Sequence, residues 1–438
     1  MYQLQVEHDR HDPEYEESET SESQEPDPEP AIEDNAEEDF SADSFDNNIP
    51  DVAEEDEENY ESIPSRIEHV NITQSFIDEI KKATLDNGKL DPSVVNRLRN
   101  PERGIVDMTD PDIRFSLDLY MSCTNASEAT YNGVRQSVLR RFPQIDVLSY
   151  YLAKKLISEI SGVVSVNDDM CINSCHAFTG PFSALDACTI CSEPRYSEFL
   201  SGRQIKKKPR QQAITIPLGP QIQALRRSVN GANSMGYQER KTKEIFSVLA
   251  ALENDLDNIY DDILCGEDIL KLSETLNLTS DDTTVIFSLD GAQLYQDKKS
   301  DTWIGIWIII NYDPKIRSRK KRVLPAFIVP GPHKPKLIDS YLFRSFHHLS
   351  AIQRENNGAG IPVFNAAKNT VVLSRTIFLA ATADAVGLTE VDGRVGHHGT
   401  RGCRKGCPMI GRRKPSSGHY FAAHLKPNNY QVRSEERV

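Results

Sequence analysis

The sequence predicts an α/β protein with a disordered N-terminal tail, in which a helical region and a cysteine module precede a mixed sheet with flanking helices. Three observations lead to this prediction. Acidic residues crowd the N-terminal segment, four cysteines fall between positions 171 and 191, and apolar runs of strand length follow from position 283. A chain of 438 residues is long enough for two or three domains.

The N-terminal tail, residues 1–65, is predicted to be disordered because it has too few apolar residues to offset the entropy lost on folding. Residues 1–62 hold 25 acidic side chains and one arginine, which leaves 41 acidic and 49 basic side chains in the rest of the chain. The net charge of −16 is therefore the sum of a strongly acidic tail and a basic body, residues 63–438. Such a body can bind a phosphate backbone, and a surplus that only aids solubility is an equally good interpretation.

The N-terminus, MYQLQVEHDR, lacks the apolar core of a signal peptide. The longest apolar stretch, Trp303–Ile310, is too short to span a membrane. We therefore expect an intracellular protein without membrane contact. In that reducing setting clustered cysteines bind metal more often than they form disulfides.

Residues 66–165 are predicted to be helical, because apolar residues recur there at three- and four-residue spacing. Asp91 before Pro92 is typical of a helix start. Residues 201–236 are basic and contain Gly and Asn, which suggests a linker. A long amphipathic helix is expected over Tyr237–Leu264.

The segment 237–438 is predicted to form the α/β domain. Strands are expected at 283–290, 301–312 and 322–330, with a basic hairpin turn, PKIRSRKKR, between the last two. A helix is expected at 338–355. Residues 370–387 are apolar and fit either a strand or a helix.

The cysteine module, residues 166–200, gives the strongest metal signal in the chain. Cys171 and Cys175 form one pair, and Cys188 and Cys191 form a second pair after a gap of twelve residues. Two such pairs can complete a tetrahedron around zinc, so we predict a closed, structural, zinc-ribbon-like site. His176 could replace one of the ligands. The alternative is four unrelated buried thiols.

A second and weaker cluster lies in GHHGTRGCRKGC, where His397 and His398 precede Cys403 and Cys407. Two thiolates with one or two imidazoles would suffice for a zinc ion. A basic loop with incidental cysteines is the competing interpretation. Cys123 and Cys265 are expected to be ordinary packed thiols.

Two basic runs are candidates for nuclear import or for contact with DNA phosphates. Each run is weak evidence alone, but together with a zinc module they favour nucleic acid. The residues concerned are Lys206, Lys207, Lys208 and Arg210 in the first run, and Arg319, Lys320, Lys321 and Arg322 in the second.

Asp290 ends the apolar run TTVIFSLD. A carboxylate at the end of a strand can hold Mg²⁺ or Mn²⁺, which in two-metal nucleases activate water and stabilise the leaving oxygen. That chemistry needs two or three acids from distant parts of the chain. Spacing alone favours the plainer interpretation, in which the aspartate caps a turn or helix.

Four segments, taken together, favour the metal-binding interpretation of Asp290 over a capping role. They are CINSCHAFTGPFSALDACTICSEPRY, SLDGAQLYQDKKSDTWIGIWIIINYDP, LPAFIVPGPHKPKLIDSYLF and ATADAVGLTEVDGRVGHHGTRGCRKGC. They resemble the transposases of CACTA-like (En/Spm-type) DNA transposons, closest to the fungal type, over about 165–425. The resemblance implies an RNase H-like nuclease core of the DD(E/D) type. Such enzymes nick DNA at the ends of the element with the help of Mg²⁺ or Mn²⁺ and join the freed 3′-hydroxyl to target DNA.

On this sequence the resemblance makes Asp290 the first acid and Asp384 the second, with Asp339 as the runner-up for the second. The family's third acid should lie on a helix beyond the cysteine pair 403/407. The sequence there offers only Glu435 and Glu436, in a polar tail, and neither is assigned. The core is therefore expected to be incomplete at its C-terminus, with impaired activity.

The function expected from the resemblance is that of a nuclear, transposase-derived protein that binds the transposon ends and the target DNA, and that could form homo-oligomers. No small-molecule substrate is expected. The alternative is a catalytically dead remnant that only binds DNA or protein through its zinc-stabilised module. A zinc-ribbon regulator unrelated to nucleases would not explain the ordered series of strands, acid and helix.

Overall fold

The computed structural model describes residues 67–104, 106, 108–201, 204–251, 261–293, 301–392, 398–402, 409–414 and 418–421. The predicted disordered tail lies outside these residues, as do the chain's last residues from 422 onward. Among the described residues no helix is both long enough and apolar enough to cross a bilayer.

The region predicted to be helical contains five helices in its described part. They are α1 (Glu68–Lys81), α2 (Pro92–Arg99), α3 (Pro111–Ser122), α4 (Glu128–Arg141) and α5 (Tyr150–Ser161). Short polar side chains begin four of them, because Asp91, Asp110, Ser127 and Ser149 each accept a hydrogen bond from a backbone N–H of the first turn. The predicted start of α2 at Asp91 and Pro92 is confirmed.

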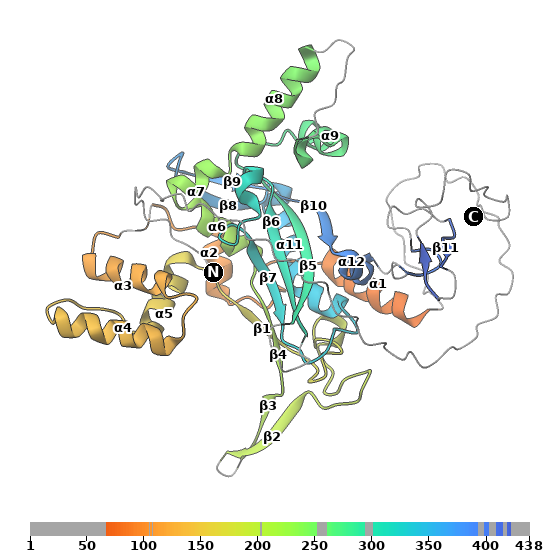
Figure 1. Ribbon diagram of the computed structural model, residues 1–438, viewed down its shortest axis with the longest axis horizontal. Helices are drawn as coiled ribbons and strands as arrows, with labels where there is room; N and C mark the ends of the chain where they lie inside the picture. The colour runs from red at the N-terminus through yellow and green to blue at the C-terminus, as the bar shows by residue number, and fades with distance from the viewer. Residues whose placement is uncertain are drawn as a thin grey trace, which may run out of the picture. The chain divides into compact units, whose positions relative to one another are not determined.

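A six-stranded mixed sheet forms the centre of the fold, in the order β1-β4-β7-β6-β5-β10 (Figure 1). Its strands are β1 (Val166–Asp169), β4 (Gln212–Thr215), β5 (Thr283–Gln293), β6 (Asp301–Ile309), β7 (Leu324–Val329) and β10 (Thr376–Ala383). Neighbouring strands are antiparallel except β5 and β10, which run parallel. The chain reaches β10 from β7 through α11 (Asp339–Arg354), η3 (Glu355–Gly358) and the hairpin of β8 (Ile361–Asn365) and β9 (Thr370–Ser374).

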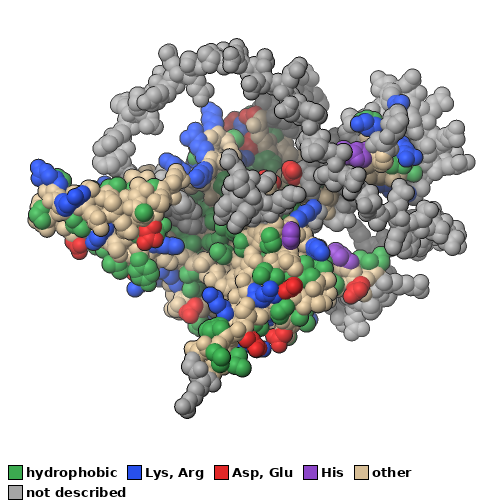
Figure 2. All heavy atoms as spheres, turned by 60° about the horizontal axis from the view of Figure 1, so that its bottom comes forward, with side chains coloured by type: hydrophobic (Ala, Val, Ile, Leu, Met, Phe, Trp, Pro, Cys, Tyr) green, Lys and Arg blue, Asp and Glu red, His purple; other side chains and the backbone are tan. Residues whose placement is uncertain are grey.

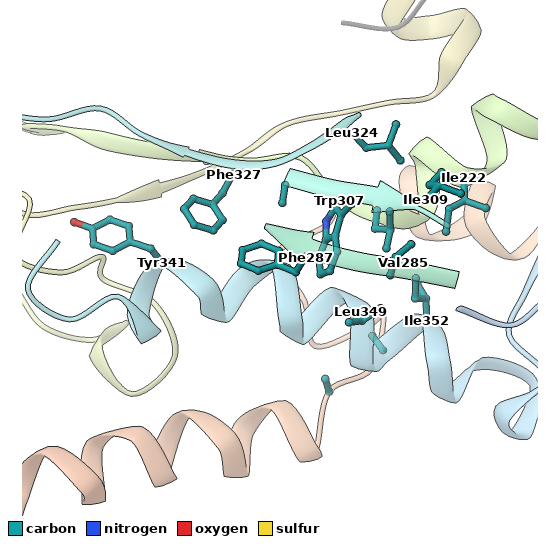
Figure 3. Packing of buried hydrophobic residues seen from close by; sticks show 14 of the residues in the cluster. Ile222, Val285, Phe287, Trp307, Ile309, Leu324, Phe327, Tyr341, Leu349 and Ile352 are labelled. Carbon is teal, nitrogen blue, oxygen red and sulfur yellow. The ribbon is translucent and has the colours of Figure 1, made fainter. Parts of the chain in front are cut away.

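The largest core cluster lies between this sheet and α11 (Figure 3). Trp307 and Phe287 are fully buried, and their rings pack edge to face at 5.1 Å between centroids. Phe346 of α11 contacts both rings, and so joins the helix to the middle of the sheet. A smaller cluster covers part of the other face, where Ile286 of β5 meets Ile269 of α9 (Glu267–Thr275).

The structure corrects the prediction of a basic linker over 201–236. Its described residues form β3 (Gln204–Pro209), β4, α6 (Leu218–Arg226) and α7 (Val229–Ser234). The segment looked like a linker because it is rich in polar residues. Three of these, Gln221, Gln223 and Arg226, are in fact buried and donate hydrogen bonds to backbone carbonyls. Composition alone could not distinguish such residues from solvated ones.

Other boundaries also differ from the predictions. Strand β5 continues to Gln293, so Asp290 lies inside the strand and not at its end. The turn between β6 and β7 contains a short helix, α10 (Pro314–Arg317), which Asp313 caps. The ambiguous segment 370–387 forms strands β9 and β10 and then enters α12 (Ala385–Asp392). The predicted helix from Tyr237 is α8 (Tyr237–Ala251), and residues 252–260 lie outside the described part.

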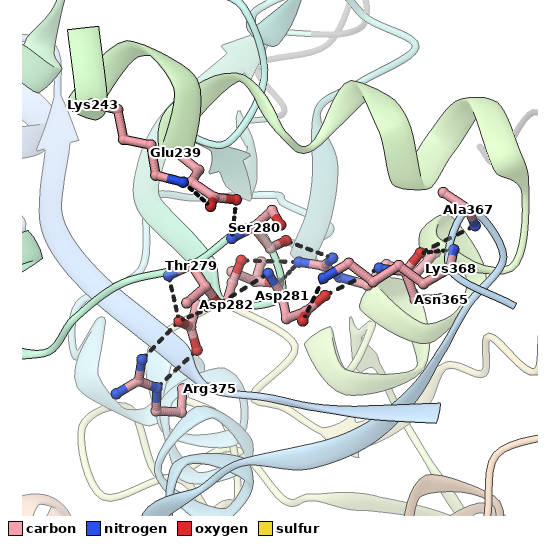
Figure 4. A network of polar contacts seen from close by, with 12 residues as sticks. Glu239, Lys243, Thr279, Ser280, Asp281, Asp282, Asn365, Ala367, Lys368 and Arg375 are labelled. Atoms are coloured by element: carbon pink, nitrogen blue, oxygen red, sulfur yellow. Dashed lines mark hydrogen bonds and ion pairs between the residues drawn. The ribbon is translucent and has the colours of Figure 1, made fainter. Parts of the chain in front are cut away.

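A network of hydrogen bonds and ion pairs connects the start of β5 to the segment that precedes β10 (Figure 4). The carboxylate of Asp282 accepts hydrogen bonds from both ends of the Arg375 guanidinium, at 2.8 and 2.7 Å, and from the backbone of Thr279. Burial of Asp282 works against ionisation, but these donors outweigh it and hold the pKa of Asp282 below its usual value. The network therefore favours the ionised form.

Replacing Asp282 with Asn is expected to lower the free energy of unfolding by about 1.5 to 3 kcal/mol, the range for hydrogen bonds to a charged group. Since the folded pKa lies below the unfolded value of about 3.9, this contribution is complete above that pH. It is lost as the pH falls through the folded pKa. Urea unfolding at pH 7 and pH 3 measures both effects.

The control for that measurement is Glu267→Gln, because the pair formed by Glu267 and Lys271 is exposed on α9. Its unfolding midpoint should stay close to that of the unmodified protein. Equal midpoints for Asp282→Asn and the control at pH 7 would show that the network adds little to stability.

Candidate metal centre

Two short loops of similar backbone geometry carry the four clustered cysteines. In the first loop the Cys171 N–H donates to the His176 carbonyl, and in the second the Cys188 N–H donates to the Glu193 carbonyl. An isolated β-bridge closes each loop, Met170 with Ala177 and Ala187 with Pro194. The two loops are therefore knuckles that present their cysteines from tight turns.

A serine adopts a left-handed conformation in each knuckle, with φ of 57° at Ser174 and 59° at Ser192. A non-glycine residue is uncommon in this region and costs free energy there. The strain lets each loop turn sharply enough to bring its two cysteines together. Sequence analysis missed both positions, because serine gives no sign of a left-handed turn where glycine would.

The four thiols, Cys171, Cys175, Cys188 and Cys191, could hold a metal ion, since their sulfur atoms all lie within 4.8 Å of one another. A tetrahedral zinc site with bonds of about 2.3 Å places its sulfurs roughly 3.8 Å apart. The observed spacing fits that requirement, and the Sγ atoms of Cys171 and Cys191 lie 3.4 Å apart. Three of the cysteines are buried and Cys191 is half-buried.

The knuckles affect the protonation of their thiols in opposite directions. Burial raises the pKa of Cys171 to about 11 and raises that of Cys175 further. Burial also opposes ionisation of Cys191, but hydrogen bonds from the Glu193 backbone and from the side chains of Cys171 and Asn173 lower its pKa to about 6. A thiolate among buried thiols is a first ligand for a cation, and binding would release the remaining protons.

His176 does not join the four cysteines. Its Nε2 accepts a hydrogen bond from the Thr189 N–H at 3.2 Å, and its Nδ1 lies 3.0 Å from the Ala177 carbonyl. Burial lowers its pKa, so the ring is neutral and joins the two knuckles by packing and hydrogen bonding. The sequence-based alternative in which His176 replaces a cysteine is therefore not supported by its position.

The cysteine module is fixed to the N-terminal end of α11. The Cys175 carbonyl accepts hydrogen bonds from the backbone N–H groups of Lys336 and Leu337, just before the helix. The Ala177 N–H donates to the Ser340 hydroxyl at 2.9 Å, and the Thr179 hydroxyl donates to the Ser340 carbonyl. The module thus supports a helix that covers the main core.

The second predicted cluster falls mostly outside the described residues, which exclude His397, Cys403 and Cys407. His398 is described, and its ring stacks on that of His419 at 4.4 Å between centroids. We looked for three or more His, Cys, Asp or Glu side chains that lie close enough to share a metal ion. Within the described part of the chain, the four cysteines are the group that meets this condition.

Of the two predicted acids, Asp290 lies on β5, and Asp384 directly follows β10, the parallel neighbour of β5. Ala383 is in register with Leu289, the last pair of this ladder, so Asp384 and Asp290 each directly follow a member of that pair. Leu289 faces the core below α11, and alternation along a strand directs Asp290 to the opposite face. Both aspartates are exposed, and the Asp384 carboxylate also accepts a 2.6 Å hydrogen bond from the Gly387 N–H at the start of α12.

Asp339, the runner-up for the second acid, lies elsewhere. It begins α11, and its carboxylate accepts a 2.6 Å hydrogen bond from the Thr73 hydroxyl of α1. Its neighbours are therefore α1 and the cysteine module rather than β5. In the described residues no third ligand lies near enough to Asp290 and Asp384 to complete a group of three.

The two basic runs occupy opposite ends of the sheet. Lys206, Lys207 and Lys208 are exposed on β3, while Arg210 pairs with Glu193 of the second knuckle. The second run, 319–322, connects β6 to β7 at the end where β5 begins. There Arg319 donates to the Lys315 carbonyl, Arg322 lies 5.0 Å above the Tyr312 ring, and Lys320 and Lys321 are exposed.

Comparison with known proteins gives no relative from which a function can be transferred. No protein-family model matches this sequence, and no curated protein is significantly similar to it. The features that indicate a function are therefore the geometry of the cysteine module, the two aspartates and the basic residues.

Proposed function

We propose that this chain is a transposase-derived DNA-binding protein with an RNase H-like core and a structural zinc ion. One observation carries the proposal: the parallel pairing of β5 with β10 brings Asp290, within β5, and Asp384, directly after β10, to the same end of the two strands. The order β7-β6-β5-β10 supports it. An RNase H-like sheet is expected to have three antiparallel strands, then a helix, and then a fourth strand that runs parallel to the first.

Zinc is the metal we propose for the cysteine module. Four thiolates at this spacing match the tetrahedral sulfur sites that zinc prefers, and all four positions would be taken by protein. Such a site has no open position for water or substrate. The ion would therefore stabilise the knuckles and their contacts with α11 without taking part in a reaction.

The aspartate pair could hold a hard cation, Mg²⁺ or Mn²⁺, through carboxylate oxygens. When bound, such a cation supplies Lewis acidity toward a phosphate oxygen and lowers the pKa of water. The chain's own contribution would be to hold two carboxylates at fixed positions on rigid strands. A third carboxylate is missing from this group in the described residues, so we propose weak activity, with DNA binding alone as the second candidate function.

The basic character of the folded region supports DNA as the partner, because residues beyond the acidic tail carry more basic than acidic side chains. Most of the affinity should come from phosphate contacts. We therefore expect the affinity for duplex DNA to fall steeply with salt, by about a thousandfold between 50 and 200 mM if six or more phosphates are contacted. Fluorescence anisotropy at several salt concentrations measures this slope.

The experiment that tests the proposal combines this titration with a cleavage assay on supercoiled DNA in Mn²⁺, for the unmodified chain and for Asp290→Asn. Binding with Asp290-dependent nicking supports the nuclease. Binding without nicking supports the alternative, a remnant that only binds. Absence of binding, or binding that does not change with salt, would refute a role on DNA.

A further inference from the structure

We propose that the hairpin of β2 (Tyr196–Ser201) and β3 is an arm that enters the major groove of duplex DNA, and that the cysteine module anchors this arm. The inference rests on the proposed function, because it assigns a place to the DNA that the core would bind. The hairpin projects away from the sheet as a two-stranded ribbon (Figure 1).

The ribbon lacks the apolar contacts that normally hold a hairpin against a protein body. Most of its residues are exposed, including Phe199 at 47%, Leu200 at 79% and Ile205 at 67%. Figure 2, which turns this side of the molecule forward, shows hydrophobic side chains near the end of the arm. Large exposed apolar side chains are typical of a surface that meets a partner. Of these three, Phe199 lies on the face of Lys206, while Leu200 and Ile205 pair on the opposite face.

Cross-strand register divides the charges of the ribbon between its two faces. Phe199 pairs with Lys206 and Ser197 pairs with Lys208, so these four side chains share one face. That face carries two lysines beside an exposed aromatic ring and no acidic residue among its described positions. Lys207 lies on the other face, opposite Glu198 and 5.7 Å from the Tyr196 ring. The face with Phe199 is therefore the one suited to a polyanion.

The dimensions of the ribbon suit the major groove. Two strands roughly 4.8 Å apart and six residues long form a strip about 20 Å in length. The major groove of B-DNA, about 12 Å wide, admits a two-stranded ribbon. Lysines along such a strip would face phosphates on the groove walls, which gives affinity with little dependence on base sequence.

Two arginines hold the base of the arm to the cysteine module. Arg195, directly before β2, donates to the Asp169 carboxylate at 2.8 Å and to the carbonyls of Ser183 and Leu185. Arg210, directly after β3, pairs with Glu193, whose carbonyl accepts from Cys188. Loss of a metal ion from the knuckles would therefore weaken the Arg210 contact, while Arg195 would keep its ion pair with Asp169 of β1.

The arm also leaves the fold at the end of the sheet that carries the two aspartates. Gln211, just after β3, donates to the Pro330 carbonyl beyond the end of β7. Val329 at that end is in register with Trp303, which pairs with Gly291, the neighbour of Asp290. The basic run 319–322 is at the other end, so the arm and not that run is placed to guide DNA toward Asp290.

The test compares the full chain with the double variant Lys206→Glu/Lys208→Glu, using a 30-base-pair duplex and fluorescence anisotropy. We expect at least about 50-fold weaker binding at 0.1 M salt, and a salt slope smaller by about 2, from the loss of two phosphate contacts. The matched control Lys154→Glu/Lys155→Glu changes the same charge on exposed positions of α5 and should weaken binding far less. Zinc content, measured on all three proteins, reports that the anchor is intact.

The outcomes separate this inference from the proposed function. DNA binding by the unmodified chain with equal losses in both double variants would overturn the arm and leave the proposed function standing. No DNA binding by the unmodified chain would overturn both. Ribbon-dependent binding to phosphatidylserine vesicles, or ribbon-dependent dimerisation, with DNA affinity unchanged in Lys206→Glu/Lys208→Glu, would also overturn the arm and identify another occupant.

Discussion

With zinc in the cysteine module as proposed, the variant Cys175→Ala is expected to lose the ion and several kcal/mol of folding stability. Structural zinc in small domains contributes on the order of 10 kcal/mol or more to folding, and three remaining sulfurs would leave the tetrahedron open. The effect should extend beyond the knuckles, because the Cys175 carbonyl receives the backbone N–H groups that precede α11. Metal analysis by mass spectrometry and urea unfolding measure the two effects.

Two comparisons make this prediction specific. Cys265→Ser, which changes a half-buried cysteine outside the cluster, should keep about one zinc per chain and nearly the original stability. Treating the unmodified protein with a zinc chelator should expose residues 170–195 to protease, and added zinc should restore protection. A chelated protein with unchanged protection and stability would show that the four thiols form a packed cluster that needs no metal.

The cysteine module shows why some sites can be predicted from sequence. Metal-ligand spacing is local, so two pairs of cysteines indicated a tetrahedral site before any fold was known, and the close approach of the four sulfurs confirms that they could share an ion. The features that make the module stiff were not visible in the sequence. They are the left-handed serines at 174 and 192 and the hydrogen bond between His176 and Thr189.

The sheet illustrates the opposite case. The strands at 283, 301 and 322 and the helix at 338 were predictable because their apolar runs are long. Their order was not, since the pairing of β10 with β5 joins residues about ninety positions apart. The prediction of a linker at 201–236 was wrong for a different reason. Its buried glutamines and Arg226 satisfy backbone carbonyls in the core, and a hydropathy pattern counts such residues as exposed.

The variants Asp290→Asn and Asp384→Asn are each expected to weaken Mn²⁺ binding to the folded core by more than about a hundredfold. Changing an outer-shell partner of a metal typically costs 10- to 100-fold, and loss of a direct carboxylate ligand should cost more. Asparagine keeps the oxygen that caps α12 at position 384, so the local fold should survive. Titration followed by electron paramagnetic resonance counts free and bound Mn²⁺ directly.

The acidic tail complicates that titration, because 25 carboxyl groups bind cations weakly wherever they lie. This background is the same in every variant, so the difference between proteins isolates the core site. Asp118→Asn on α3 removes one carboxylate far along the chain from both strands and should leave the tight Mn²⁺ site unchanged. If Asp290→Asn and Asp118→Asn bind Mn²⁺ alike, the aspartate pair holds no cation. The second candidate function, DNA binding alone, would then be favoured, since the proposed nuclease needs the metal ion to activate water and stabilise the leaving oxygen.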